Sequence, residues 1–123
     1  IAATTALFHQ ISESNPSYSI RQRIEGKDLI GLKYEPLFNF PELQNEKSHR
    51  VYAADFVSTA EGTGIVHTAV MYGEDDYELG KQVGLPMRHT VDEQGNFTKN
   101  VPIFGGQYVK SADKGIISYF FLG

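Results

Sequence analysis

Residues 61–80 read EGTGIVHTAVMYGEDDYELG, and this stretch decides the fold that the sequence predicts. After a Gly-Thr-Gly turn, the β-branched run at 65–72 is typical of a strand. A glycine ends that run, and three consecutive acidic residues then begin a helix predicted over 75–83. Asp75, with a glutamate three residues later, has the spacing of a capping box. The stretch therefore predicts a strand that leads directly into a helix.

The flanking sequence adds more elements of both kinds. Alternating or β-branched apolar residues predict further strands at 18–25, 51–59 and 88–91, and extended chain broken by two glycines at 101–109. Helical spacing of apolar residues predicts helices at 4–11 and 111–122. Strands thus occupy the middle of the chain, and helices lie at its ends and at one crossing. The sequence predicts an α+β domain with a curved, barrel-like mixed β-sheet and a few flanking helices.

The length and composition exclude several classes of protein. The chain has 123 residues, of which 41% are hydrophobic, so it fits one globular domain rather than a disordered segment. The absence of cysteine excludes disulfides, a thiolate nucleophile and zinc sites that use sulfur, and it suits a reducing compartment. No apolar run is long enough to span a membrane. The net charge of −4 argues against binding nucleic acid through bulk charge.

His67 is the residue with the clearest potential for chemistry. Strand periodicity puts it on one face with Ile65, Ala69 and Met71, so a polar ring interrupts an apolar row. The acidic triplet at 74–76 follows near the same end of the predicted sheet, where a pocket could open. Two plainer interpretations stay open: a hydrogen-bonded histidine at the rim of the core, and acids that only stabilise a helix start.

Other patterns favour turns over ligand sites. The Gly-Thr-Gly at 62–64 lacks the third glycine of a dinucleotide-binding loop. Residues 92–96 lack the later ligands of a calcium loop, so they predict a hairpin turn. The four histidines, at 9, 49, 67 and 89, are not spaced as metal ligands. The residues alone predict no metal site and name no substrate.

Five segments together resemble the editing domain, or connective peptide domain, of isoleucyl-tRNA synthetase of the archaeal and eukaryotic type. They are GKDLIGLKYEPL at 26–37, GTGIVHTA at 62–69, GEDDY at 73–77, GLP at 84–86 and TVDEQG at 90–95. The resemblance implies the synthetase editing-domain fold, with a single domain over 1–123. It implies a truncated fragment of a larger class I aminoacyl-tRNA synthetase, without the synthetic catalytic domain. The first residue is not Met, which also favours a piece of a longer protein.

The same resemblance implies an enzyme, an isoleucine–tRNA ligase with aminoacyl-tRNA hydrolase activity that serves translational fidelity. Its editing domain would hydrolyse valyl-tRNA(Ile), with valyl-adenylate as a further candidate substrate. The implied partner is the 3′ end of tRNA(Ile) carrying valine. The fragment itself would use no cofactor, because ATP and Mg serve the absent synthetic domain. A cytoplasmic, monomeric fragment without membrane contact is expected.

Site residues also follow from the resemblance. Asp76 is expected to hold the substrate's α-ammonium group, and His67 to shape the small side-chain pocket and orient the ester, as the two candidate catalytic residues. The expected substrate-binding residues lie around them: Gly62, Thr63, Gly64, Ile65, Thr68, Gly73, Glu74 and Asp75. The family's threonine-rich strand is absent, and Val70 stands where the family often has proline, so weak or no activity is expected of the isolated fragment. Two alternatives stay open: a non-catalytic amine-ligand-binding module and a free-standing aminoacyl-tRNA deacylase.

Overall fold

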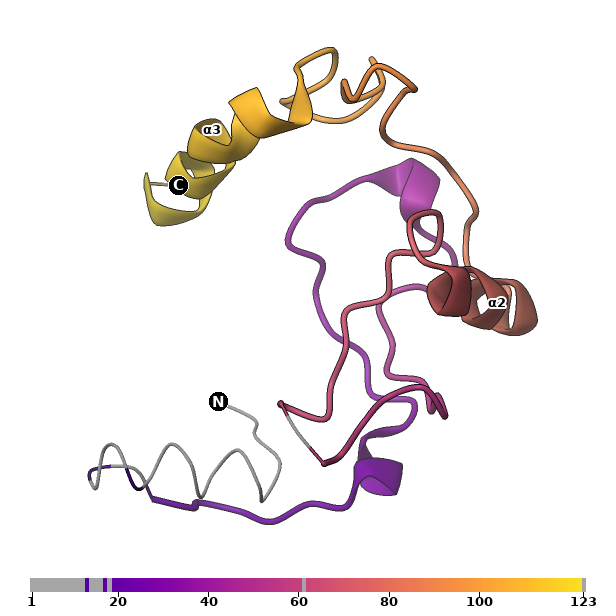
Figure 1. Cartoon of the computed structure of the whole chain (residues 1–123), viewed down its shortest axis with the longest axis vertical. Coiled ribbons are helices and arrows are strands. Elements are labelled where there is room, and N and C mark those ends of the chain that lie inside the picture. The colour runs from indigo at the N-terminus through magenta and orange to yellow at the C-terminus, as the bar shows by residue number, and fades with distance from the viewer. Residues whose placement is uncertain (1–12, 14–16, 18, 61, 123) are drawn as a thin grey trace.

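The computed structural model describes residues 13, 17, 19–60 and 62–122. Its helical elements, in chain order, are η1 (Gly26–Leu29), η2 (Pro41–Leu43), α2 (Glu74–Val83) and α3 (Val109–Leu122). The chain follows an open arc with α3 at one end and α2 on the opposite side (Figure 1). None of the described helices is long and apolar enough to cross a membrane. The helix predicted at 4–11 lies outside the described residues.

The predicted β-sheet is absent from the described part of the chain. Strand pairing there is limited to three isolated antiparallel bridges, namely Lys33 with Arg50, Val91 with Phe97, and Asn96 with Tyr108. The runs predicted as strands at 51–59 and 65–72 contain no strand residues. The prediction of a curved, barrel-like mixed sheet is therefore wrong for this structure.

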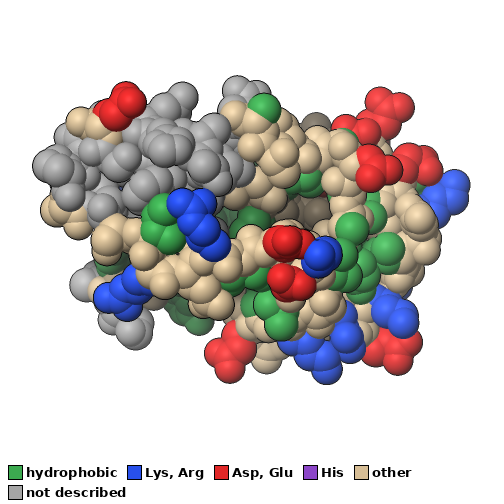
Figure 2. All heavy atoms as spheres, turned by 90° about the horizontal axis from the view of Figure 1, so that it is seen from below, with side chains coloured by type: hydrophobic (Ala, Val, Ile, Leu, Met, Phe, Trp, Pro, Cys, Tyr) green, Lys and Arg blue, Asp and Glu red, His purple; other side chains and the backbone are tan. Residues whose placement is uncertain are grey.

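The predicted strands do not form because each strand needs a neighbouring strand for its backbone hydrogen bonds. The apolar pattern shows only that a segment could pack against a core. No backbone hydrogen bond joins residues 66–68 to any other described residue. Only Phe40, Phe104 and Ala112 are buried among the described hydrophobic residues. Hydrophobic side chains reach the surface between acidic and basic groups on the face seen from below (Figure 2). Without an apolar face to pack against, β-branched runs gain little from strand formation.

The prediction of a helix after Gly73 is confirmed, because local signals define both ends of α2. Gly73 is the N-cap and makes no side-chain capping bond, so the predicted capping box at Asp75 is wrong. The acidic triplet instead occupies the first turn, where the helix dipole favours negative charge. Gly84 ends the helix in the left-handed region, with φ of 81°. The N–H groups of Gly84 and Leu85 both donate to the Gly80 carbonyl, at 2.9 and 2.8 Å.

The predicted C-terminal helix is also confirmed, and α3 begins two residues before the expected start at 111. Aromatic contacts fix it to the segment that precedes η2. The ring of Phe38 stacks on Tyr119, with centroids 5.6 Å apart, and meets Phe120 edge-on at 4.9 Å. It also contacts Phe104, which is buried. Aromatic pairing thus holds α3 at this segment, although Tyr119 and Phe120 stay partly exposed.

Residues 92–96 form the predicted hairpin turn between the bridged residues Val91 and Phe97. The Asp92 N–H donates to the Asn96 carbonyl at 2.8 Å, and the Asn96 N–H donates to the Asp92 carboxylate at 2.8 Å. The Gln94 N–H adds a bond of 3.0 Å to the same carboxylate. The Asp92 side chain therefore closes its own turn.

Replacing Gly80 with alanine should destabilise the chain. A Cβ atom there would lie 2.5 Å from the Cγ1 of Val70, closer than real Cβ contacts. Overpacking of this kind costs about 1–3 kcal/mol, measured as a lower midpoint of thermal unfolding followed by circular dichroism. Gly26→Ala is the matched control, since nothing lies within 4 Å of its added Cβ. Adding Val70→Ala to Gly80→Ala should restore stability, and unchanged stability of Gly80→Ala alone would contradict this packing.

The Asp92 turn should weaken at acid pH. The donated N–H of Asn96 lowers the pKa of the Asp92 carboxyl below its ordinary value of 3.8. A group with a lowered folded pKa stabilises the turn above its unfolded pKa, and that stability is lost as pH falls through the folded value. Carboxyl carbon shifts in an NMR titration should give a midpoint below 3.8 for Asp92. Asp92→Asn should remove the corresponding pH dependence of the Asn96 amide shift; persistence of that dependence would refute the assignment.

Candidate functional site

The segment after His67 ends in a turn that is tied to the first turn of α2. The Tyr72 N–H donates to the Ala69 carbonyl at 2.8 Å, and the Ala69 N–H donates to Oδ2 of Asp76 at 3.1 Å. A Cβ on Gly73 would lie 3.0 Å from that carboxylate oxygen, so a glycine lets the carboxylate approach. Asp76 is half-buried. Its carboxylate thus fixes the turn through a charge-assisted bond.

The Tyr72 hydroxyl connects this turn to the segment that enters the hairpin. It accepts the N–H of Thr90 at 2.9 Å and the N–H of Val91 at 3.0 Å, and it lies 3.0 Å from Oγ1 of Thr90. The ring of His89 meets the Tyr72 ring edge-on. Residues far apart in the sequence are therefore held together by one phenol group.

Backbone hydrogen bonds hold the loop at residues 49–51 against residues 31–34. The Gly31 N–H donates to the Val51 carbonyl at 2.9 Å, and the Tyr34 N–H donates to the His49 carbonyl at 3.0 Å. Asn45 joins the same loop to the end of α2, because its side-chain amide donates to the Gly84 carbonyl at 2.9 Å. These bonds bring the loop and the segment carrying His67 around one cavity.

The cavity has a volume of about 750 Å³, which is in the range that holds a drug-sized ligand. Its lining residues come from four parts of the chain, within 26–34, 43–59, 64–72 and 79–90. Most of the lining side chains are apolar. The charged side chains among them are Arg50 and Arg88, and no Asp or Glu of the described chain lines it. The cavity therefore suits a largely apolar ligand with a negatively charged part.

The structure brings some of the sequence-predicted site residues to this cavity. Those that line it are Gly64, Ile65, His67 and Thr68. Those outside its lining are Gly62, Thr63, Gly73, Glu74, Asp75 and Asp76. Within the described residues, no hydrogen bond or ion pair joins His67 to Asp76. The two candidate catalytic residues thus lie at opposite ends of one short segment, with His67 at the cavity and Asp76 at the turn.

Sequence reasoning missed most of the polar lining residues, among them Arg50, Tyr72, Arg88 and Thr90. The motif at 90–95 includes Thr90, but nothing in its local sequence indicates a partner 18 residues away. No group of three or more His, Asp or Glu residues in the described ranges could hold a metal ion.

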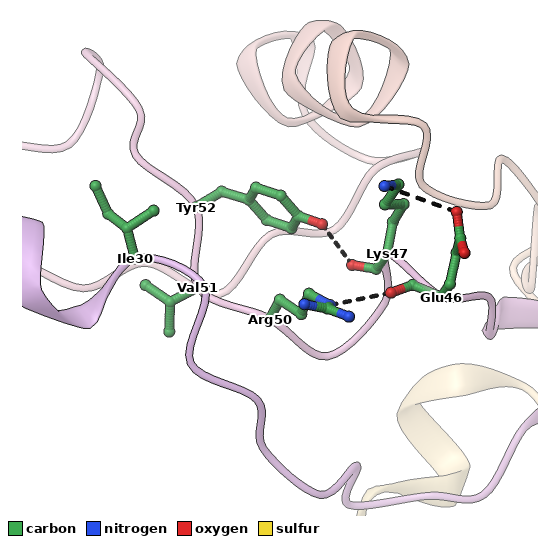
Figure 3. Close-up of a pocket in the computed structure, with 7 residues that line it drawn as sticks. Ile30, Glu46, Lys47, Arg50, Val51 and Tyr52 are labelled. Atoms are coloured by element: carbon green, nitrogen blue, oxygen red, sulfur yellow. Dashed lines mark hydrogen bonds and ion pairs between the residues drawn. The ribbon is translucent and has the colours of Figure 1, made fainter.

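A smaller cavity of about 240 Å³ lies beside the first and shares Ile30, Arg50, Val51 and Tyr52 with it. The side chains of Arg50 and Tyr52 both point toward residues 46–47 (Figure 3). The Tyr52 hydroxyl donates to the Lys47 carbonyl at 2.7 Å, and Nε of Arg50 donates to the Glu46 carbonyl at 3.0 Å. These bonds orient Arg50 at the boundary between the two cavities.

Removing the Asp76 carboxylate should loosen the turn after His67. Asp76→Ala leaves the Ala69 N–H without its acceptor; a lost bond to a charged group costs about 1.5–3 kcal/mol, so hydrogen exchange at the Ala69 amide should accelerate. The matched control is Glu78→Ala, an exposed position on the same helix. Equal exchange rates at Ala69 in both variants would contradict the bond.

No protein-family model matches the chain. It is 46% identical over 111 residues to the cytoplasmic isoleucine–tRNA ligase of Saccharomyces cerevisiae, covering 85% of this chain and 10% of that protein. It is 44% identical over 108 residues to isoleucine–tRNA ligase of Chlamydia pneumoniae, covering 86% of this chain and 10% of that protein. The corresponding enzyme of Bdellovibrio bacteriovorus is 39% identical over 119 residues, covering 96% of this chain and 11% of that protein.

The chain spans about a tenth of the length of these relatives. They come from a yeast and from bacteria, so the expected archaeal and eukaryotic type stays a prediction. The chain is therefore homologous, over most of its length, to one segment of isoleucine–tRNA ligases.

Proposed function

We propose that this chain is an editing region of an isoleucine–tRNA ligase, which hydrolyses valine from tRNA(Ile). The observation that supports this most is that six residues of one segment that resembles the editing domain, 62–69, line the large cavity. The identity of the relatives as isoleucine–tRNA ligases supports the link to isoleucine and its tRNA. The parent enzyme, with ATP and Mg at a separate synthetic site, would charge the tRNA, and this region would correct it.

An apolar cavity suits the removal of valine after a first selection by size. One extra methylene gains about 1–3 kcal/mol in a hydrophobic pocket, a limit for which isoleucine against valine is itself the usual example. A second site can admit valine and exclude the larger isoleucine. Ile65 and His67 lie where they could narrow such a pocket, since both line the cavity.

The charges around the cavity favour the end of a nucleic acid over a free amino acid. Arg50 and Arg88 can bind phosphate, and guanidinium groups do so with two parallel hydrogen bonds. The 3′ end of tRNA would bring both the phosphate and the valine ester. A water held near the ester would attack its carbonyl carbon, so no protein nucleophile is needed.

Asp76 would act from the edge of this site. Its Oδ2 is occupied by the Ala69 N–H, whereas Oδ1 has no hydrogen bond in the described structure. In this proposal Oδ1 holds the α-ammonium group of valine, and the turn keeps the carboxylate in place. The remaining predicted residues, Gly62, Thr63, Gly73, Glu74 and Asp75, would form the rim.

A chimeric enzyme tests the proposal. The aligned segment of the yeast cytoplasmic ligase is replaced by this chain, and the release of valine from valyl-tRNA(Ile) is measured. Asp76→Ala should reduce the rate roughly 10- to 100-fold, the value of a charged hydrogen bond to the ammonium group. The chimera with His67→Ala should release isoleucine from isoleucyl-tRNA(Ile) faster than the unsubstituted chimera, because the smaller side chain widens the pocket. Glu78→Ala is the control and should behave as the unsubstituted chimera.

Each outcome has a clear meaning. A chimera with Asp76→Ala that corrects valine at the normal rate refutes the role of Asp76. An unsubstituted chimera that binds a valine ester analogue without releasing valine favours the amine-binding module. One that neither binds nor hydrolyses refutes the proposal as a whole.

A further inference from the structure

The Tyr72 hydroxyl makes three polar contacts with two consecutive residues, Thr90 and Val91. It lies 2.9 Å from the Thr90 N, 3.0 Å from the Val91 N and 3.0 Å from the Thr90 Oγ1. Tyr72 and Thr90 both line the large cavity. The backbone of Thr90 is fixed from its other side as well, because the Thr98 N–H donates to its carbonyl at 2.9 Å.

Counting protons fixes the direction of the third contact. A phenol oxygen has one hydrogen to donate and about two lone pairs that accept. The two backbone N–H groups can only donate, so they occupy both lone pairs of the Tyr72 oxygen. The contact with Thr90 Oγ1, in which either oxygen could be the donor by distance, must then use the hydrogen of Tyr72. Thr90 Oγ1 is the acceptor.

The hydroxyl hydrogen of Thr90 is left without an acceptor among the described residues. Thr90 is half-buried as a residue, and its contact with Tyr72 is exposed, so a ligand in the cavity would compete with water for this hydrogen. We propose that the Thr90 hydroxyl donates a hydrogen bond to an uncharged acceptor oxygen of the ligand in the large cavity. Tyr72 is the positioning residue, because its hydrogen occupies one acceptor site of Thr90 Oγ1 and so restricts the directions in which the Thr90 hydrogen can point.

The class of ligand oxygen follows from the proposed function, on which this step rests. A valine ester offers a carbonyl oxygen, which accepts hydrogen bonds and carries no formal charge. A donor that is already oriented loses little entropy on binding, so it discriminates well between a ligand with this oxygen and one without it. Thr90 would thus recognise the ester carbonyl, and Ile65 and His67 the side chain.

Two small ligands test the step in the full chain. Valinamide carries the amine, the isopropyl group and a carbonyl; 3-methylbutan-2-amine has a methyl group in place of the carboxamide. Binding is followed by NMR at the backbone amides of the cavity. Thr90→Val should weaken the binding of valinamide roughly three- to tenfold, which is the contribution of one neutral hydrogen bond. The affinity for the carbonyl-free amine should stay unchanged. Thr90→Ser, which keeps the hydroxyl, should restore valinamide binding.

Tyr72→Phe separates positioning from direct contact. Without the phenol oxygen, the Thr90 hydroxyl can rotate, so the preference for valinamide over the carbonyl-free amine should shrink while binding of that amine persists. In the ligand-free variant, the amides of Thr90 and Val91 should exchange faster. Unchanged exchange would refute the hydrogen-bond arrangement from which the donor was inferred.

The results distinguish this step from the proposed function. Equal affinity of valinamide for the unsubstituted chain and for Thr90→Val overturns the role of Thr90, whatever the chimera does with tRNA. A Thr90-dependent preference for valinamide, with no release of valine from tRNA by the chimera, supports Thr90 and refutes the hydrolase. Failure of the chain to bind valinamide at millimolar concentration overturns the role of Thr90, whereas the release of valine from tRNA by the chimera decides the proposed function separately.

Discussion

The hydrogen bond between the Ala69 N–H and the Asp76 carboxylate is the constraint on which the rest of the site depends. It anchors the turn after His67 to α2, and the Tyr72 N–H closes that turn by donating to the Ala69 carbonyl. Because the turn is closed, Tyr72 leaves it at a fixed position and reaches Thr90 and Val91. The contact of Gly80 with Val70 adds packing to the same joint. One carboxylate thus sets the relation between the histidine segment, the helix and the hairpin.

The core is too small to fix these parts by apolar packing alone. Three hydrophobic residues are buried in the described chain, and much of the aromatic contact lies around Phe38, away from the large cavity. The cavity walls are held by side-chain to backbone bonds, such as those of Asn45 and Tyr72. Such bonds are directional, so they can define local geometry where packing is sparse. Each contributes about 1 kcal/mol, so the walls should yield more readily than a closed core.

How far the sequence predicts this structure depends on the range of each interaction. The bounds of α2 follow from residues within the helix and its caps, so Gly84 and the acidic triplet predict them well. The hairpin turn at Asp92 is equally local. A sheet requires partners distant in sequence, and the alternation of apolar residues does not provide them. The sheet was therefore predicted wrongly, and two of the predicted strands, 51–59 and 65–72, contain turns instead.

The same distinction explains the site. His67 can be predicted as a cavity residue because its position in an apolar run is a local property. The bonds from Asp76 to Ala69 and from Tyr72 to Thr90 cannot, because they join a side chain to a backbone group that carries no sequence signal. The acids of α2 had been interpreted as a helix start or a ligand site. Asp76 lies in the first turn of α2, where an acidic residue stabilises the helix start. Its Oδ2 also accepts the Ala69 N–H, so the two carboxylate oxygens are not equivalent. The Ala69 N–H takes one acceptor site of Oδ2, whereas Oδ1 accepts no hydrogen bond in the described structure, so the proposed ammonium contact is assigned to Oδ1.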